Sequence, residues 1–448
     1  MESPAARLAR TVAARLKEAG YQAYLAGGCV RDMLLGLEPK DYDIATSARP
    51  TDVVALFPKA QLVGAHFGVA LISEAEAAVE VATFRSDHAY RDGRRPESVS
   101  FENDPRQDVA RRDFTINGLL LDPDAREALD FVGGRADLEA KIVRAIGEPE
   151  SRFDEDRLRM LRAVRFAARL GFEIEPGTFA AIERLHAKIQ SIAAERIRDE
   201  LVRILTEGGA RRGFELLDRS GLLGEILPEV AAMKGVAQPP EFHPEGDVWT
   251  HTLLMLEGLR APSPVLAMAV LLHDVGKPPT FRVADRIRFD GHAELGAEMA
   301  VRILTRLRFS NAEIRRVEQL VANHLRFKDV TRMRESTLKR FLRQENFEDH
   351  MELHRLDCAM SHRLLGNYEF LRRKQAEAPP EKLNPPRLVT GDDLIAAGYA
   401  PGPAFAGILS AVEDAQLEGA VHNSGEAMAL VRDRFAPPDG RERGDMPE

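Results

Sequence analysis

The stretch LAGGCVRDMLLGLEPKDYDIAT, residues 25–46, organises the first part of the chain. An apolar run ends at Gly27 and Gly28, and a short helical pattern then leads to Asp41 and Asp43. Glycines let backbone N–H groups approach a ligand closely, and the start of a helix attracts anions. Residues two apart on a strand share a face, so Asp41 and Asp43 can converge on one cation. The stretch therefore predicts a phosphate cradle beside a divalent metal site, as in nucleotide chemistry.

Composition places the chain among soluble proteins of several domains. At 448 residues it is too long for one compact core, and 44% hydrophobic with 30% charged residues is an ordinary globular balance. No apolar run approaches the ~20 residues of a membrane span. The two cysteines, Cys29 and Cys358, favour a reducing cytoplasm. The formal net charge of −9 means that any contact with RNA must use local basic faces.

Periodicity and turn residues divide the chain into five expected domains. The first mixes strands and helices and predicts an α+β domain with a small sheet, whereas the others are helical. Its strands are expected at residues 21–26, 43–45, 69–72, 79–84 and 119–121. One long helix is expected over 151–172, ending near Gly171, and residues 436–448 are expected to be disordered. The expected domains are 1–147, 148–210, 211–247, 248–374 and 375–448.

Three further features of the first half carry chemistry. Glu80 lies between two valines of an expected strand and is a candidate third carboxylate for the metal pair. RRDFTINGLLLD, residues 111–122, places polar groups before an apolar strand, and FDEDRLRMLRAVRF, residues 153–166, spaces them three apart on one helix face. These groups are Arg111, Arg112, Asp113 and Asn117, then Asp156, Arg159, Arg162 and Arg165. Alone, the arginine face is typical of a solvated helix, but beside the other motifs it indicates a ligand site.

Five motifs follow one another in the order GGCVRDMLLG…DYD, RRDFTIN, DFVGGRADL, EDRLRMLRAVRF and AAERIRDEL. In this order they resemble the bacterial (class II) tRNA nucleotidyltransferase and poly(A) polymerase family, over about the first half of the chain. The resemblance implies a polymerase-β-type nucleotidyltransferase head, then a helical neck, body and tail. In this chain the head would be 1–147, the neck 148–210 and the body with its connector 211–247.

The resemblance also implies roles for single residues. Asp41 and Asp43 would bind Mg²⁺, and the metal would activate the RNA 3′-hydroxyl and neutralise the departing pyrophosphate. The triphosphate would be held by Gly27, Gly28 and Arg31, and the ribose by Arg112 and Asp113. Asp156 and Arg159 would read the base of CTP or ATP, since arginine offers a planar fork of donors and aspartate two acceptors. We add Asn117, Arg162 and Arg165 to this nucleotide-binding set.

The charged segment RSDHAYRDGRRPESVSF, residues 85–101, is similar to the family's flexible loop. In the family this loop helps the enzyme change from adding C to adding A, and members restricted to adding CC lack part of it. Its full length here favours addition that includes the terminal A. Without the flanking motifs, a solvated loop would be the preferred interpretation.

Histidines and aspartates recur at ligand-like spacing in the second helical block. They are His251, His273, Asp274, His292, His324 and Asp357. Such groups bind transition metals, and metal-bound water hydrolyses phosphoesters. A lone histidine on an apolar helix is more often a core residue, but several candidates around LLHDVGKP, residues 271–278, favour a metal centre.

The order of these residues resembles the HD phosphohydrolase superfamily. The resemblance implies an all-helical HD-type domain at 248–374, a metal such as Mn, Ni, Fe or Zn, and a phosphatase or phosphodiesterase activity. Lys277 is expected either to contact a phosphate or to be a helix C-terminal charge. His243, His354 and His362 have no clear partner and are interpreted as structural.

These inferences predict a template-independent enzyme that builds CCA on tRNA from CTP and ATP, with no membrane and no obligate protein partner. A poly(A) polymerase or an enzyme adding only the final A remains an alternative within the family. A protein acting mainly as an HD-type phosphohydrolase is the alternative of another class. Candidate RNA contacts are Arg302, Arg306, Arg308, Arg315, Arg316, Arg332, Arg334, Lys339, Arg340, Arg343, Arg372, Arg373 and Lys374.

Overall fold

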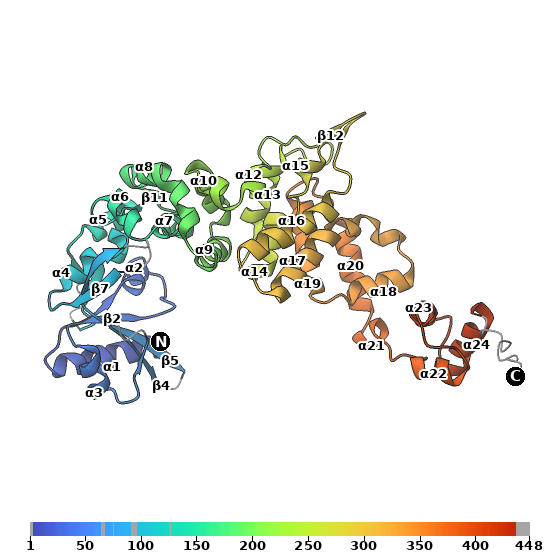
Figure 1. Ribbon diagram of the computed structural model, residues 1–448, viewed down its shortest axis with the longest axis horizontal. Helices are drawn as coiled ribbons and strands as arrows, with labels where there is room; N and C mark the ends of the chain where they lie inside the picture. The colour runs from blue at the N-terminus through green and yellow to red at the C-terminus, as the bar shows by residue number, and fades with distance from the viewer. Residues whose placement is uncertain (1–2, 64–67, 75, 91–95, 125–127, 436–448) are drawn as a thin grey trace, which may run out of the picture.

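The structure is a computed structural model that describes residues 3–63, 68–74, 76–90, 96–124 and 128–435. The molecule is elongated, with a sheet-containing head at one end, helices through the middle and a small helical module at the other end (Figure 1). This arrangement confirms the expected fold class, an α+β head followed by helical parts. The expected disorder of 436–448 lies outside the described residues.

The head is built on one mixed sheet with the strand order β3-β4-β5-β2-β1-β8-β9. Its strands are β1 (Ala23–Ala26), β2 (Asp43–Thr46), β3 (Gln61–Leu62), β4 (Val69–Glu74), β5 (Ala77–Thr83), β8 (Leu119–Leu121) and β9 (Ala128–Asp130). All five strands expected from the sequence are present, with small shifts at their ends. Helices α1 (Pro4–Glu18), α2 (Gly28–Leu34) and α3 (Pro50–Leu56) complete this part of the head.

The strand register brings the acidic groups together. β1 and β2 are antiparallel, with Ala26 opposite Asp43, so the glycine pair after β1 lies beside the start of β2. β2 and β5 are parallel, with Asp43 opposite Glu80. Ile44 and Val81, the next pair in register, are fully buried and anchor this edge in the core. The apolar alternation of the strands therefore fixes where the carboxylates emerge.

The segment expected as a charged loop is an antiparallel hairpin. Its strands are β6 (Arg85–Tyr90) and β7 (Pro96–Phe101), with Arg85 opposite Phe101. The expectation of a loop was therefore wrong for the strands, and the tip, 91–95, lies outside the described residues. Beyond the hairpin come α4 (Pro105–Ala110), the short helix η2 (Thr115–Asn117), α5 (Gly134–Ala140) and β10 (Ile142–Val143).

The single long neck helix expected over 151–172 is two helices, α6 (Pro149–Glu155) and α7 (Arg159–Leu170). Between them Asp156 is extended, with φ −143° and ψ 103°. Its Oδ1 accepts a hydrogen bond of 3.1 Å from the Leu158 N–H, which competes with the helical pattern. The expectation that Asp156 lies on the same helix face as Arg159 was therefore wrong.

The remaining neck and body elements are helical apart from a short strand, β11 (Glu173–Ile174). The helices are α8 (Pro176–Leu185), η3 (His186–Ser191), α9 (Ala194–Thr206), α10 (Ala210–Arg219), α11 (Leu222–Ile226) and α12 (Pro228–Ala231). α9 packs on α7 and faces the head.

The second helical block surrounds one buried helix, α14 (Pro264–Leu272). α14 is apolar along its length, and every residue from Val265 to Leu272 is buried, as expected for a helix enclosed on all sides. Against it pack α13 (Val248–Gly258), α17 (Asn311–Asn323) and α19 (Phe347–Ala359). The block also contains α15 (Lys277–Thr280), α16 (His292–Arg306), η4 (His324–Arg332), α18 (Glu335–Leu342) and α20 (Gly366–Glu377). A small hairpin, β12 (Arg282–Val283) and β13 (Ile287–Arg288), projects from the block. Among the described helices, none is long and apolar enough to cross a membrane.

A small C-terminal module has an apolar cluster of its own. It contains α22 (Gly391–Ala396), α23 (Ala404–Leu417) and α24 (Ser424–Arg434), whereas α21 (Pro380–Leu383), which precedes it, packs through Leu383 on the apolar cluster of α18. Leu394, Tyr399, Ile408 and Val431 are among the residues of its core.

Candidate active site and candidate metal centre

A cavity of about 530 Å³ lies where the head meets the neck. All the residues predicted to bind the nucleotide line it, and so do both predicted metal ligands of the D-x-D pair, Asp41 and Asp43. The nucleotide-binding residues are Gly27, Gly28, Arg31, Arg112, Asp113, Asn117, Asp156, Arg159, Arg162 and Arg165. Lys40, Phe166, Arg203 and Glu207 also line it and were missed. Lys40 could have been found from its place beside Asp41, whereas the other three depend on how α7 and α9 pack.

The acidic end of the cavity holds Asp41 and Asp43, with Glu80 close by on the adjacent strand. Burial raises the pKa of Asp43 to about 6, and the charges of Glu80 and Asp41 add to the rise against the opposing charge of Arg112. Glu80 is exposed and is not a lining residue. Carboxylates that repel one another in this way fit a divalent cation with a preference for oxygen ligands.

The raised pKa predicts a pH dependence of cation binding. Below about pH 6 Asp43 is protonated, so a cation must displace a proton, and above pH 6 the carboxylate is already free. We therefore expect the Mg²⁺ affinity to fall as the pH falls below 6, by up to about tenfold per pH unit, and to be flat above about pH 7. Calorimetric titration with Mg²⁺ from pH 5 to 8, with circular dichroism as a check on folding, measures this. An affinity that is unchanged across that range would contradict the assignment of Asp43.

The turn at Gly27 and Gly28 has no space for a side chain at Gly27. Gly27 has φ 72° and precedes α2. A Cβ on it would lie 3.0 Å from Arg112 Nη1 and 3.8 Å from Asp43 Oδ2, so a side chain would crowd both groups. Arg31, on α2, is buried and donates to Asp32 Oδ1 from Nε at 2.8 Å and to Asn117 Oδ1 from Nη1 at 2.7 Å. Its guanidinium is therefore held in one orientation at the cavity wall.

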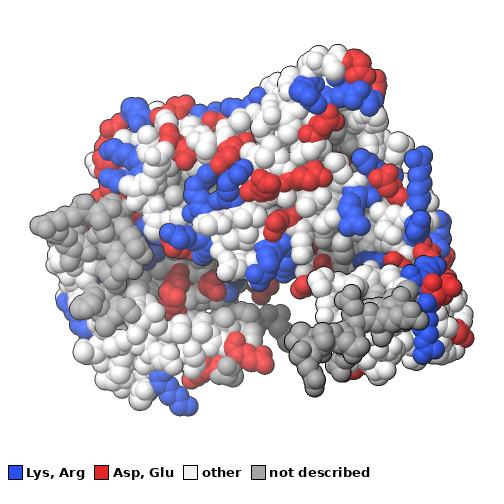
Figure 2. Space-filling model, turned by 45° about the vertical axis from the view of Figure 1, so that its right-hand side comes forward, with Lys and Arg blue, Asp and Glu red and all other residues white. Residues whose placement is uncertain are grey.

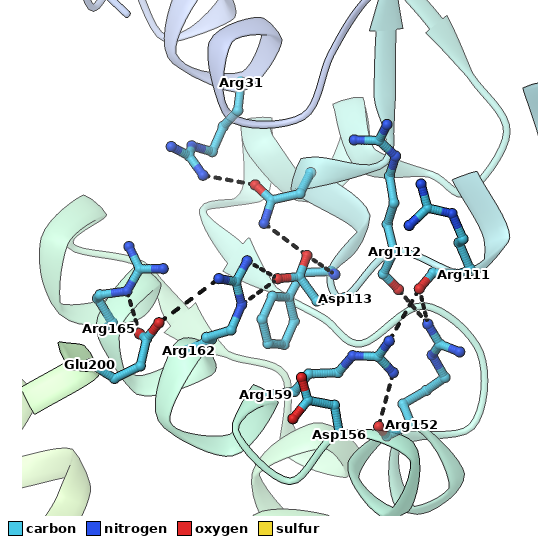
Figure 3. A network of polar contacts seen from close by, with 12 residues as sticks. Arg31, Arg111, Arg112, Asp113, Arg152, Asp156, Arg159, Arg162, Arg165 and Glu200 are labelled. Carbon is cyan, nitrogen blue, oxygen red and sulfur yellow. Dashed lines mark hydrogen bonds and ion pairs between the residues drawn. The ribbon is translucent and has the colours of Figure 1, made fainter. Parts of the chain in front are cut away.

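Ion pairs join the head to the neck around this cavity (Figure 3). Asp113 Oδ2 accepts from Arg162 Nη2 at 2.6 Å, and Asp113 Oδ1 accepts from Asn117 Nδ2 at 3.0 Å. Arg165 Nε donates to Glu200 Oε2 at 2.7 Å, and Arg162 lies 3.9 Å from the other Glu200 oxygen. Burial acts to raise the pKa of Asp113, but Arg162 and the hydrogen bonds keep it well below its usual range.

The same chain of contacts returns to the head on the other side. Arg165 Nη1 lies 3.2 Å from Glu207 Oε2, and Arg169 reaches the same oxygen at 4.0 Å. Arg169 Nη2 then donates to Asp32 Oδ2 at 3.1 Å, and Asp32 holds Arg31. The contacts thus close into what we call the head–neck ring: Asp113, Arg162, Glu200, Arg165, Glu207, Arg169, Asp32, Arg31 and Asn117.

One aromatic ring lies against the arginines of the head–neck ring. The guanidinium carbons of Arg165, Arg31 and Arg162 lie 4.3, 5.0 and 5.4 Å from the centroid of Phe166. Cations over an aromatic face are stabilised, more so when desolvated. Arg159 and Arg165 are buried, so this is not the solvated helix surface that the arginine spacing alone would indicate.

Asp156 and Arg159, predicted to read the base, are each held by other groups. Asp156 Oδ2 accepts from Arg196 Nη2 at 2.9 Å. Arg159 Nη1 donates to the Arg152 carbonyl at 2.9 Å and to Glu155 Oε2 at 2.8 Å. The two side chains are therefore fixed separately, Asp156 by a residue of α9 and Arg159 by residues of α6.

Arg152 binds backbone carbonyls of the head in addition to forming an ion pair. Its Nη2 donates to the carbonyls of Arg111 at 2.5 Å and Arg112 at 2.6 Å, and it also pairs with Glu155. Arg152 thereby ties the neck to the backbone that carries Arg112. This contact links the predicted ribose-binding and base-reading groups.

The predicted ligands of the second block converge on its centre. His273 and Asp274 follow the buried helix α14, His292 begins α16, and His324 follows α17. The Nε2 atoms of His273, His292 and His324 lie 3.1, 3.6 and 3.9 Å from oxygens of Asp274. On α13, His251 places its Nε2 3.2 Å from Asp357 Oδ1 of α19.

The orientation of the imidazoles suits metal binding. The Nδ1 atoms of His273, His292 and His324 each lie 2.6–2.9 Å from the carbonyl three residues earlier, so Nε2 faces the centre. The Nε2 atoms of His251, His273 and His292 are buried without a hydrogen-bond partner among the described residues. Burial lowers the pKa of His324 to about 4, which leaves its imidazole neutral. The described residues offer three groups of three possible ligand atoms, His243–Glu245–His251, His251–His273–Asp357 and Asp274–His292–His324.

His243 and Lys277 differ from their expected places. His243 Nδ1 lies 2.9 Å from Glu245 Oε1, the same oxygen that lies 2.7 Å from His251 Nδ1, so it does have partners. Burial lowers the pKa of His251, but the neighbouring carboxylates of Asp357 and Glu245 raise it to about 9. Lys277 begins α15 rather than ending a helix, and its Nζ lies 2.6 Å from Asp274 Oδ2.

Three family models match the chain. Residues 23–144 match the poly(A) polymerase head domain, 171–234 the probable RNA and SrmB-binding site of polymerase A, and 247–361 the HD domain. The chain is 43% identical over 206 residues to the CCA-adding enzyme of Limosilactobacillus fermentum, covering 46% of this chain and 51% of that one. The chain is 44% identical over 217 residues to the CCA-adding enzyme of Geobacillus stearothermophilus, covering 48% of this chain and 53% of that one. The chain thus spans about half the length of these curated relatives.

Solved structures resemble the whole chain. The Bacillus stearothermophilus CCA-adding enzyme in complex with CTP superposes with a TM-score of 0.75 at 29% identity, covering 96% of this chain and 99% of that one. The Thermotoga maritima CCA-adding enzyme complexed with tRNA has a TM-score of 0.58 at 20% identity, covering 95% and 94%. At that identity the second match shows the fold alone.

Proposed function

We infer that this chain belongs to the poly(A) polymerase head-domain family of nucleotidyltransferases and carries an HD domain. From this premise we propose that it builds the CCA end of tRNA. It would transfer CMP and AMP from CTP and ATP to the RNA 3′ end and release pyrophosphate. One observation carries the proposal: a single cavity holds both the acidic pair and the donors and acceptors that can read a base.

In this proposal the divalent cation is Mg²⁺, held by Asp41 and Asp43 with Glu80 as a candidate third ligand. When bound it supplies charge neutralisation at the phosphates and activation of the 3′-hydroxyl. The turn at Gly27 and Gly28 and the guanidinium of Arg31 orient the triphosphate.

The remaining cavity residues fix the sugar and the base. Arg112 and Asp113 bind the ribose, while Asn117, Arg162 and Arg165 hold that wall in place through the head–neck ring. Asp156 and Arg159 bind the pairing edge of the base, as acceptor and donor, without a nucleic-acid template.

The test uses tRNAs that end before CCA, after C and after CC. Each is incubated with CTP, ATP or both, and the new 3′ ends are sequenced. We expect CCA to be completed on all three and to stop there. Long A tails would instead identify a poly(A) polymerase, and growth only on tRNA ending in CC an A-adding enzyme.

Base selection should depend on Asp156 and Arg159. We expect Asp156→Ala or Arg159→Ala to reduce discrimination between CTP and UTP by about ten- to a hundredfold, since one bidentate pair is worth about 1–3 kcal/mol. Ratios of kcat/KM for the two nucleotides on tRNA lacking CCA measure the effect. Asp154→Ala, which removes an exposed acid of the adjacent helix α6, is the matched control. Equal discrimination in all three variants would rule out a base-reading role.

We propose a second activity, metal-dependent phosphoester hydrolysis, for the HD-type centre. Its support is the set of inward-facing Nε2 atoms and a cavity of about 490 Å³ above them. Cations that can bind a phosphate line this cavity, namely Lys277, Arg286, Arg288 and Lys328. A transition metal, Mn, Ni, Fe or Zn, would supply the activated water.

We also propose domain boundaries at 147/148, 210/211, 247/248 and 374/375, and a cytoplasmic location. The location is supported by two buried free cysteines, Cys29 and Cys358.

A further inference from the structure

The C-terminal module meets α18 through charged side chains. Arg340 Nη2 lies 2.7 Å from Glu413 Oε2, and Arg340 also pairs with Asp414. Arg343 Nη2 lies 2.6 Å from the other oxygen of Glu413. Lys339 Nζ donates to the Leu417 carbonyl at 2.6 Å. The last turns of α23 thus place two acids over Arg340 and Arg343 and a carbonyl over Lys339, and we call these contacts the tail latch.

Apolar packing does little to hold this contact. The module's own core forms one cluster, and α18 belongs to another, around Phe327, Phe341 and Phe347. Among the described residues, no member is shared between the two clusters. Partly exposed ion pairs are weak and are screened by salt. The tail latch is therefore a contact that competing anions can open.

The cations of the tail latch continue into exposed ones. Arg332 and Arg334, just before α18, are exposed and form no ion pair within the described residues. Elsewhere the charges are intermixed: Figure 2 shows basic and acidic side chains alternating over the face in view. With a net charge of −9, a local row of cations is what an RNA backbone needs.

We propose that the α18 face of Lys339, Arg340 and Arg343 binds the phosphate backbone of tRNA, and that Glu413 and Asp414 cover it until RNA arrives. The inference rests on the proposed function, because it takes tRNA as the ligand. The carboxylates occupy the positions that phosphate oxygens would take, since arginine binds both anions through the same donor fork. RNA has the advantage of many phosphates and of counterion release, which two carboxylates lack.

The test removes the covering acids and keeps the cations. In Glu413→Gln/Asp414→Asn we expect the module to leave α18, seen as larger molecular dimensions in X-ray scattering. We expect tRNA binding at low salt to become about five- to tenfold tighter, because weak surface ion pairs no longer compete. We expect the slope of log affinity against log salt to steepen by about one to two, because each phosphate that a freed cation neutralises adds about one to this slope.

Two further variants separate RNA binding by α18 from simple docking of the C-terminal module on α18. Arg340→Glu should also release the module but should weaken tRNA binding, because it removes a cation. Asp392→Asn/Asp433→Asn removes two charges from the same module at exposed positions and should change neither property. If the acid variant matches the wild type in affinity and slope, or moves in the same direction as Arg340→Glu, the inference is wrong.

Extension of tRNA by the wild-type protein shows whether a negative result overturns this inference alone or the proposed function as well. A wild type that extends tRNA, beside an acid variant with unchanged binding, overturns this inference alone. A wild type that neither binds nor extends tRNA overturns the proposed function and this inference together.

Discussion

Replacing Asp41 or Asp43 by alanine is expected to abolish nucleotide addition. Metal ions stabilise developing charge by several kcal/mol, and about 4 kcal/mol corresponds to about 10³ in rate. Single-turnover extension of tRNA ending in CC measures the loss. The fold should survive, because Asp41 is exposed and Asp43 is only partly buried.

Glu38→Ala is the matched control, since Glu38 is an exposed acid of the same loop. Calorimetry should show that the alanine variants still bind CTP without metal, which separates loss of the cation from loss of the cavity. An Asp43→Ala enzyme that keeps more than a tenth of the wild-type rate would contradict the assignment of the metal site.

Replacing His273 by alanine, or Asp274 by asparagine, is expected to empty the HD-type centre and leave extension unchanged. Loss of an outer partner alone costs about 10–100-fold in metal affinity, so loss of a ligand should cost more than about 100-fold. Bound metal is measured by mass spectrometry after dialysis, and hydrolysis with a chromogenic phosphodiester. Asparagine is chosen because it keeps an oxygen acceptor beside the buried ammonium of Lys277, which would otherwise be left with Gln238 Oε1 at 2.6 Å.

His362→Ala serves as the control, because His362 lies outside the candidate ligand groups of the described chain. Loss of both hydrolysis and extension in a folded His273→Ala protein would show that the two centres are not independent. Full metal content in that variant would remove His273 from the ligand set.

The sequence predicts the head well because its signals are local. Alternating apolar residues place Ile44 and Val81 in the core, and their register then fixes Asp43. The break in the neck is not visible in the helical pattern, because it depends on the bond between the Asp156 side chain and the Leu158 N–H. The β6–β7 hairpin was hidden by its charged composition.

The cavity could be predicted only where motifs supply its residues. Arg203 and Glu207 come from a helix that no local pattern connects to the head, and their place depends on the packing of α9 against α7. In the second block, the ligands on helices were found, whereas His243 and Glu245 lie in a connector without periodicity. In both cases the positions of these residues depend on packing between segments that are far apart in the sequence.

The head–neck ring limits how this chain can be truncated or recombined with other proteins. Asp32 and Asp113 of the head are buried, and their partners Arg169 and Arg162 come from beyond residue 147. A fragment that ends at 147 would leave the buried Asp113 carboxylate without its counterion, and Asp32 with Arg31 alone, which is strongly destabilising. Grafting only the head onto a relative would leave the same charges facing foreign side chains. The smallest transferable unit is therefore the head together with the neck as far as Glu207.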